Sequence, residues 1–257
     1  MNEKDYLYDL LVHDLVGPLA VVSTTADSLL TKTERYGDLS ERQRECLERI
    51  RRNTRKARGF VQDILEVARS EENLFHSDRF AVQELVKEAL LEGLESVNPA
   101  AGDEFVKARN DAEAEKVLAN HLISWAISGR YAHAPFCHDR KKVLHILRNL
   151  VNNALKYRKE RMDISVSGDV DLVVTVSNDG SPISEQDRQA VYKRFVRLET
   201  NNINDVPGLG LGLFCTKALV ERMRGEISVG SREGFGTCFT VKIPLLESTN
   251  KEKEGVS

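Results

Sequence analysis

The sequence predicts two structural parts, a helical hairpin followed by an α/β sandwich. Near the N-terminus, apolar residues recur at steps of three and four in two successive segments. Later, β-rich runs and helical segments mix without regular alternation, which favours an α+β sandwich over a doubly wound sheet. A glycine-rich stretch at 208–212 precedes another helix. We expect a hairpin domain over 1–75, a sandwich over 76–247 and a disordered polar tail over 248–257.

Bulk composition excludes several classes of protein. The chain has 257 residues, 30% of them charged, and a net charge of −3. This balance indicates neither a nucleic-acid partner nor an anionic membrane surface. The longest apolar runs are a few residues, short of the roughly 20 that span a bilayer. Four scattered cysteines form no CxxC pair, so we expect no cysteine metal site and a cytosolic protein.

The hairpin is predicted from two apolar stripes. The first helix carries Leu11, Leu15, Leu19, Val22, Ala26 and Leu29 on one face. A break follows near Gly37, and Ser40 with Gln43 forms a capping-box pair at the next helix start. The second helix has a seam of alternating three- and four-residue steps: Leu47, Ile50, Thr54, Ala57, Val61, Ile64 and Ala68. A lone hairpin hides two such stripes poorly, so we expect a homodimer that forms a four-helix bundle.

The remaining elements are predicted with uneven clarity. We expect a helix over 80–94, a polar loop over 98–116 and a strand over 121–128. A helix starts at Asp139, and a strand follows over 171–177. We further expect a helix through Val191 and Phe195, a helix from the glycine stretch to Met223, and a strand hairpin over 226–245 that turns at 234–236.

Three groups of residues stand out by the chemistry of their side chains or backbone. His13 lies off the first apolar stripe, so a helix would present its imidazole to solvent beside Asp14. Asn149 and Asn153 share one helical face with Lys156, and an amide oxygen is a hard neutral ligand suited to Mg²⁺. The glycines before a helix let backbone N–H groups approach a phosphate. A dinucleotide site is disfavoured, because no strand immediately precedes this glycine stretch.

Six segments resemble, in order, the motifs of the sensor histidine kinases. They are the phosphoacceptor box His13–Leu19, the asparagine box Asn149–Tyr157, the first glycine box Asn178–Ile183, the phenylalanine box Tyr192–Arg197, the second glycine box Gly208–Leu213, and the closing segment Gly234–Phe239 with Ile243 and Pro244. The matches cover about 1–75 and 139–245. The resemblance implies a dimerisation and phosphoacceptor domain followed by an ATP-binding α/β sandwich of the histidine-kinase ATPase type.

The resemblance also implies residue roles. His13 accepts the phosphoryl group and Asp14 orients its ring. Asn153 holds Mg²⁺, Lys156 contacts phosphate and Tyr157 lies beside the adenine. The other implied ATP-binding residues are Asn149, Asn178, Gly180, Arg197, Gly208, Gly210, Gly212 and Thr237.

Three positions depart from the family pattern. Asn178 stands where the family offers an aspartate to the adenine, with Asp179 one residue out of register as an alternative acceptor. Pro182 replaces a glycine of that box. Gly17, four residues after His13, stands where family members with phosphatase activity carry threonine or asparagine.

The function implied is an ATP-dependent protein histidine kinase that autophosphorylates His13 and passes the phosphoryl group to an aspartate of a response regulator. Two alternatives stay open. One is a non-catalytic dimeric phosphotransfer protein with a decayed ATP domain, and the other is a serine kinase with a related domain. We expect either an excised catalytic core or a chain that receives its signal from a separate sensor protein.

Overall fold

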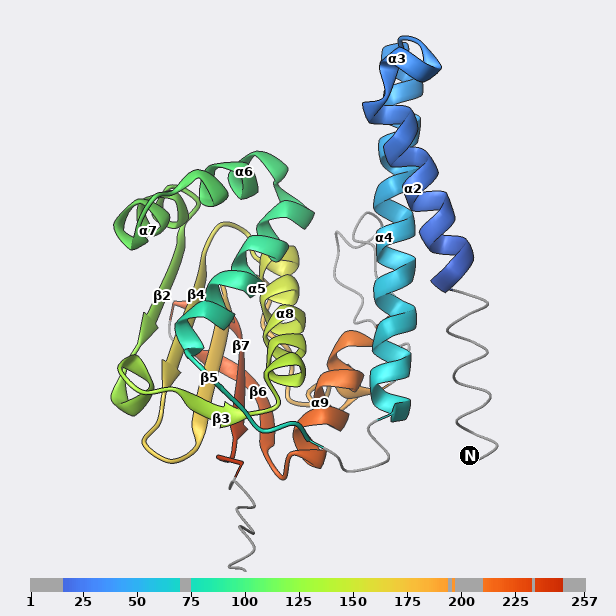
Figure 1. The fold of residues 1–257 in the computed structure, drawn as a ribbon. Coiled ribbons are helices and arrows are strands. Elements are labelled where there is room, and N and C mark those ends of the chain that lie inside the picture. The colour runs from blue at the N-terminus through green and yellow to red at the C-terminus, as the bar shows by residue number, and fades with distance from the viewer. Residues whose placement is uncertain (1–15, 70–74, 194–195, 197–209, 233, 247–257) are drawn as a thin grey trace, which may run out of the picture. The chain divides into compact units, whose positions relative to one another are not determined.

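The computed structural model describes residues 16–69, 75–193, 196, 210–232 and 234–246. Contacts within the chain divide it into two compact units, Met1–Glu72 and Asn73–Ser257. Figure 1 labels the elements of both units. No helix of the described residues is both long and apolar enough to cross a membrane.

The first unit is a helical hairpin, as predicted. Helix α2 spans Gly17–Thr31, a short helix α3 spans Thr33–Tyr36, and α4 spans Glu41–Arg69. The expected capping box is confirmed. The Gln43 Oε1 accepts the Ser40 N–H at 2.9 Å, and the Ser40 hydroxyl oxygen accepts the Gln43 N–H at 3.4 Å. These bonds satisfy donors that a helix start leaves without a partner.

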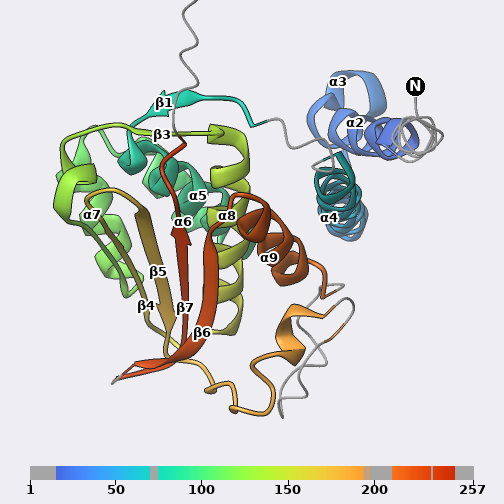
Figure 2. The same ribbon diagram turned by 90° about the horizontal axis from the view of Figure 1, so that it is seen from below.

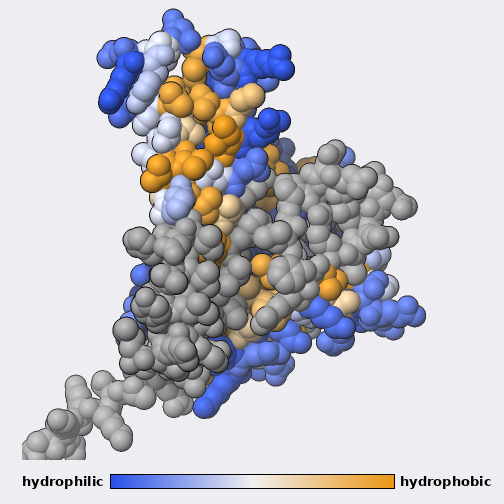
Figure 3. Space-filling model, turned by 90° about the vertical axis from the view of Figure 1, so that its right-hand side faces the viewer, coloured by the Kyte–Doolittle hydropathy of each residue, from blue (hydrophilic) through white to orange (hydrophobic). Residues whose placement is uncertain are grey.

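The hairpin buries only part of its apolar surface. Ser23, Ala26 and Leu30 of α2 and Thr54 of α4 are buried. By contrast, Val22 and Ile50, which belong to the two predicted stripes, are each 44% exposed. Figure 3 shows apolar side chains gathered along the exposed face of this unit. The hairpin therefore keeps an apolar face that its own two helices do not cover.

The second unit is built on a five-stranded sheet of order β2-β4-β5-β7-β6. Strands β2 and β4 pair in parallel, and all other neighbours pair antiparallel. The strands are β2 (Ile123–Ile127), β4 (Met162–Ser167), β5 (Leu172–Asn178), β6 (Glu226–Arg232) and β7 (Phe235–Ile243). Strands β1 (Asp78–Phe80) and β3 (Phe136–His138) form a separate antiparallel pair.

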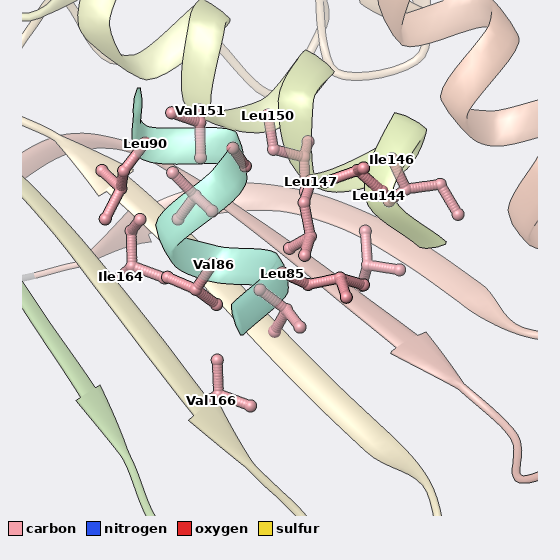
Figure 4. Close-up of a cluster of buried hydrophobic side chains, with 14 of the residues drawn as sticks. Leu85, Val86, Leu90, Leu144, Ile146, Leu147, Leu150, Val151, Ile164 and Val166 are labelled. Carbon is pink, nitrogen blue, oxygen red and sulfur yellow. The ribbon is translucent and has the colours of Figure 1, made fainter. Parts of the chain in front are cut away.

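Helices α5 (Val82–Val97), α8 (Arg140–Tyr157) and α9 (Gly212–Arg222) lie on one face of this sheet, as Figure 2 shows. Burial alternates along β4, where Met162, Ile164 and Val166 face the helices. Figure 4 shows the core between α5, α8 and β4. Its labelled members are Leu85, Val86, Leu90, Leu144, Ile146, Leu147, Leu150, Val151, Ile164 and Val166. The predicted α/β sandwich is thus confirmed as one layer of helices on one sheet.

The expected loop over 98–116 is wrong, because two helices occupy most of it. They are α6 (Pro99–Lys107) and α7 (Asp111–Asn120). The Asn98 Oδ1 accepts the Ala101 N–H at 3.3 Å, and the Asn110 Oδ1 accepts the Glu113 N–H at 2.9 Å. Both asparagines are helix N-caps of the preferred residue type. Each polar helix also buries small or apolar residues against the core, namely Ala101, Phe105, Ala114 and Leu118.

The helix expected through Val191 and Phe195 is also shorter than predicted. A 3₁₀ turn, η4, spans Ala190–Tyr192, and Lys193 is already in an extended conformation. Phe195 lies outside the described residues. A second 3₁₀ turn, η3, spans Gly129–Ala132. Strand β4 and the small β1–β3 pair were not among the predicted elements.

Candidate active site

Helix α8 carries the predicted asparagine box, with its candidate site residues Asn149, Asn153, Lys156 and Tyr157. Asp139 caps its start, where one carboxylate oxygen accepts the Lys142 N–H at 3.1 Å and the other accepts the His76 N–H at 3.2 Å. One face of α8 is fully buried against α5 and the sheet. Asn149, Asn153 and Lys156 follow one another at steps of four and three, so they form a separate polar stripe. The core thus fixes the direction in which this stripe faces.

Asn149 joins α8 to the start of α9. Its Nδ2 lies 3.4 Å from the carbonyl oxygen of Gly212, to which it donates. On its other side, the same Nδ2 lies 3.0 Å from the Nε2 of His145. A Cβ on Gly212 would lie 3.3 Å from the Oδ1 of Asn149, tighter than most such contacts. The start of α9, where the second glycine box ends, therefore lies against the asparagine box.

The second glycine box forms the N-terminus of α9. Gly210 has a φ of +70°, a conformation that L-residues with side chains rarely adopt. Leu211 precedes the helix and makes no side-chain cap hydrogen bond. A leucine side chain offers no acceptor to the first-turn N–H groups of α9, and the helix dipole places partial positive charge there. Such a terminus can bind an anion.

Lys156 and Tyr157 close the C-terminal end of α8. The Lys156 Nζ lies 5.0 Å from the centre of the Tyr157 ring, and Tyr157 as a whole is 38% exposed. A cation over a ring face at this distance is attracted by the ring quadrupole. An exposed aromatic face beside a lysine can stack on a flat heterocycle while the amine contacts a phosphate or carboxylate.

Asn178 lies at the end of β5 and is only 3% exposed. Its Oδ1 accepts the N–H of Gly180 at 2.9 Å, so the side chain closes a tight turn within the first glycine box. A carbonyl oxygen has two lone pairs, so this Oδ1 can accept from a second donor besides Gly180. The turn therefore fixes the orientation of this amide.

Asp179, the alternative acceptor one residue further on, has its carboxylate engaged by the chain itself. Its Oδ1 accepts the N–H groups of Lys159 at 2.9 Å and Glu160 at 3.1 Å. Partial burial raises the pKa of Asp179, but hydrogen bonds from the backbone of Arg161, Glu160 and Lys159 outweigh burial and lower the pKa overall. Asp179 thus anchors the loop between α8 and β4.

Gly180 and Thr237 lie where three segments converge. A Cβ on Gly180 would overlap the carbonyl oxygen of Tyr157 at the end of α8. Thr237 pairs with Asn178 across β5 and β7, and its hydroxyl donates to the Ser181 carbonyl at 2.8 Å. Thr237 is 5% exposed. Its visible role is to hold the first glycine box in place.

Four predicted site residues lie outside the described part of the chain: His13, Asp14, Arg197 and Gly208. The remaining members all belong to the second unit. Among the described residues, no three His, Cys, Asp or Glu side chains are grouped as metal ligands. A metal ion there would be held by amide oxygens together with the phosphates of a nucleotide.

Sequence reasoning missed His145. It lies four residues before Asn149 on the same stripe of α8, so helical periodicity could have placed it beside the asparagine box. A single histidine on a helix gives little signal by itself. Its contact with Asn149 makes it part of the site.

Two family models match the chain and together cover more than half of it. Residues 7–73 match the His Kinase A (phospho-acceptor) domain, and residues 138–247 match the histidine kinase-, DNA gyrase B- and HSP90-like ATPase. The chain therefore belongs to the two-component histidine kinases and carries the phosphoacceptor and ATPase domains of their catalytic core.

Particular relatives agree with this assignment. The adaptive-response sensory kinase SasA of Synechococcus sp. (strain CC9311) is 27% identical over 100% of this chain and 61% of its own length. The sensor histidine kinase WalK of Bacillus subtilis (strain 168) is 34% identical over 42% of this chain and 19% of its own. The crystal structure of full-length ShkA in complex with AMPPNP has a TM-score of 0.67 at 21% identity, over 95% of this chain and 46% of that one. The chain thus spans less than two thirds of these proteins, and ShkA supports the fold.

Proposed function

We propose that this chain is an ATP-dependent protein histidine kinase that phosphorylates its own His13 and passes the phosphoryl group to an aspartate of a response regulator. The carrying observation is the bond from Asn149 to the Gly212 carbonyl. It sets the polar stripe of α8 beside the N-terminus of α9. A magnesium-binding amide and an anion-binding helix terminus side by side form a site for the phosphates of ATP.

In this site the residues have separate tasks. The first-turn N–H groups of α9 receive the phosphates, and Lys156 neutralises part of their charge. The adenine lies near Tyr157 and Gly180, and its amino group donates to the Asn178 Oδ1. The Asn153 amide oxygen is the protein ligand of Mg²⁺, which when bound neutralises charge on the phosphates. Arg197 and Gly208 complete the phosphate contacts by family resemblance.

The phosphoryl transfer itself requires only a nucleophile and an oriented phosphate. A nitrogen of His13 attacks the γ-phosphorus, an N–P bond forms, and the bond from phosphorus to the β,γ-bridging oxygen breaks. The electron pair of that bond leaves with ADP. Asp14 accepts a hydrogen bond from the other ring nitrogen, which holds the ring and stabilises the positive charge that develops. The aspartate of the regulator then attacks the same phosphorus and displaces His13.

The exposed apolar face of the hairpin supports a homodimer. Val22 and Ile50 belong to the predicted stripes and remain exposed in a single chain. A second copy would cover them as a four-helix bundle, because two hairpins can pack their apolar faces together. Because ATP and response regulators are intracellular, we also place this catalytic part in the cytoplasm.

One observation favours a second candidate, a dimeric phosphotransfer protein without kinase activity. Asn178 lacks the charge of an aspartate, and one lone pair of its Oδ1 is already used by Gly180.

Transfer to receiver domains separates this candidate from the kinase. The protein is incubated with γ-labelled ATP and Mg²⁺, freed of nucleotide and mixed with a panel of purified receiver domains. A kinase becomes labelled and passes the label to at least one receiver. Absence of label after incubation with ATP alone, with label gained from a phosphorylated receiver, would favour the second candidate.

A further inference from the structure

His145 occupies the same polar stripe of α8 as the asparagine box. It precedes Asn149 by four residues and Asn153 by eight, so all three lie along one side of the helix. The side chain is partly buried, with the Nε2 atom 3.0 Å from the Nδ2 atom of Asn149. This distance is that of a hydrogen bond between nitrogens.

The chemistry of the two groups decides which nitrogen donates. An amide nitrogen carries two hydrogens and has no lone pair to offer, so Asn149 must be the donor. The Nε2 of His145 is then the acceptor, and the ring proton lies on Nδ1. Burial, and then the positive charge of Arg148, lower the pKa of His145 to about 4. The lone pair on Nε2 is therefore present at neutral pH.

The same amide nitrogen is also directed at α9. Its second partner is the Gly212 carbonyl oxygen at 3.4 Å. With its hydrogens directed at His145 and at Gly212, the amide has one orientation, and the Oδ1 cannot exchange places with the nitrogen. A rotated amide would set its oxygen against the lone pairs of two acceptors.

We propose that His145 is a positioning residue of the nucleotide site, whose Nε2 lone pair fixes the Asn149 amide across the junction of α8 and α9. This inference rests on the proposed ATP-binding function and adds a component to it. His145 touches neither nucleotide nor metal in this account. It acts through Asn149, and it sets the distance between the magnesium-binding stripe and the phosphate-binding helix terminus.

Two substitutions of similar size separate the lone pair from the volume of the ring. His145→Gln keeps an acceptor oxygen, and His145→Leu fills the space without one. Affinity for ADP and for a non-hydrolysable ATP analogue is measured by calorimetry with Mg²⁺. His145→Leu should weaken binding roughly tenfold, the effect expected when a buried donor loses its acceptor. His145→Gln should stay within about threefold of the parent.

A double-mutant cycle tests whether His145 acts through Asn149. In an Asn149→Ala background, His145→Leu should cause little further loss of affinity. Binding by His145→Leu equal to that of the parent would overturn the inference. An undiminished effect in the Asn149→Ala background would overturn it equally. If the parent protein binds no nucleotide, the proposed function fails instead.

A spectroscopic measurement tests the inference without nucleotide and without any variant. The ¹⁵N shifts of the His145 ring in the nucleotide-free protein at pH 7 report which nitrogen carries the proton. We expect the neutral form protonated at Nδ1, with an unprotonated Nε2. A ring protonated at Nε2 cannot accept from Asn149 and would contradict the inference, whatever the affinity measurements show.

Discussion

The main chain at Gly236 lies directly against the carbonyl oxygen of Gly180, so closely that a Cβ on Gly236 would overlap that oxygen. This approach joins the start of β7 to the first glycine box. Gly236→Ala should therefore force the box away from β7 and lower the free energy of unfolding by about 3 kcal/mol or more. Urea denaturation followed by circular dichroism measures the change.

Gly230 of β6 provides the matched control for this substitution. A Cβ there would meet no atom within 4 Å. Gly230→Ala should change the free energy of unfolding by no more than about 0.5 kcal/mol. Equal stability of the Gly236→Ala and Gly230→Ala proteins would mean that the close approach to Gly180 does not constrain the site.

Asn178→Asp should strengthen ATP binding. The adenine amino group would then donate to a charged acceptor, with an expected gain of about 1 kcal/mol, or several-fold in affinity. The Gly180 N–H, which now donates to the amide oxygen at 2.9 Å, can donate equally to a carboxylate. Calorimetric titration with ATP and Mg²⁺ checks the gain. Unchanged or weaker binding would show that Asn178 is not the adenine acceptor.

Stability should fall between about pH 6.5 and pH 4 because of His138. Burial first, and Lys142 to a smaller extent, lower the pKa of His138 to about 4, although Asp139 raises it. The His138 ring takes up a proton near pH 6.5 in the unfolded chain, whereas in the folded protein the ring stays neutral until the pH falls to about 4. The folded state is therefore fully stable above the unfolded pKa and loses up to about 3 kcal/mol as pH falls through this window.

His138→Asn isolates the contribution of this ring. The Nδ1 of His138 accepts the Asp139 N–H at 2.8 Å, and an asparagine oxygen can take its place without titrating. Urea denaturation at a series of pH values should show that the free energy of unfolding falls less steeply with decreasing pH for the variant. The difference in slope should correspond to at most one proton bound on unfolding. Parallel pH profiles for the two proteins would mean that His138 is not held neutral by the fold.

Little phosphatase activity is expected from this chain. Hydrolysis of an aspartyl phosphate needs a water held in line with the phosphorus, and a side chain one helical turn beyond His13 is placed to hold it. Gly17 has none. A Cβ there would meet no atom within 4 Å, so Gly17→Thr fits sterically and should gain phosphatase activity. Gly17→Ala is the control, since it adds about 1 kcal/mol of helix propensity but no hydroxyl.

The assay follows decay of a phosphorylated cognate regulator with this protein plus ADP. A His13→Ala version of each protein excludes return of the phosphoryl group to His13. Marked acceleration by the protein with Gly17, retained in the His13→Ala background, would contradict the prediction.

Periodicity and turn residues predicted most of the fold. The stripes of the hairpin, the capping box at Ser40 and the apolar face of α8 are local signals, and each had a regular spacing. Helices α6 and α7 were not predicted because their sequences are polar, although Asn98 and Asn110 are N-caps of the preferred residue type. Strand β4 was missed although Met162, Ile164 and Val166 alternate at the period of a strand.

The candidate site was predicted as residues but not as contacts. Spacing placed Asn149 and Asn153 on one face of a helix, yet their relation to Gly212 depends on how α8 packs against α9. The same holds for the turn that Asn178 makes with Gly180 and for the engagement of Asp179 by the α8–β4 loop. These contacts join segments that are far apart in sequence or depend on a side-chain rotamer, and neither follows from local patterns.

The central claim, that ATP phosphorylates His13, is tested most directly by incubation with γ-labelled ATP and Mg²⁺ and analysis of the label. We predict phosphate that is stable in base and labile in acid, and that maps to the peptide containing His13. His13→Ala and Asn153→Ala should both remove the label, the latter because Mg²⁺-ATP binding is lost. Asn152→Ala, an exposed neighbour on α8, should keep it. Acid-labile label that persists in the His13→Ala protein would contradict the account.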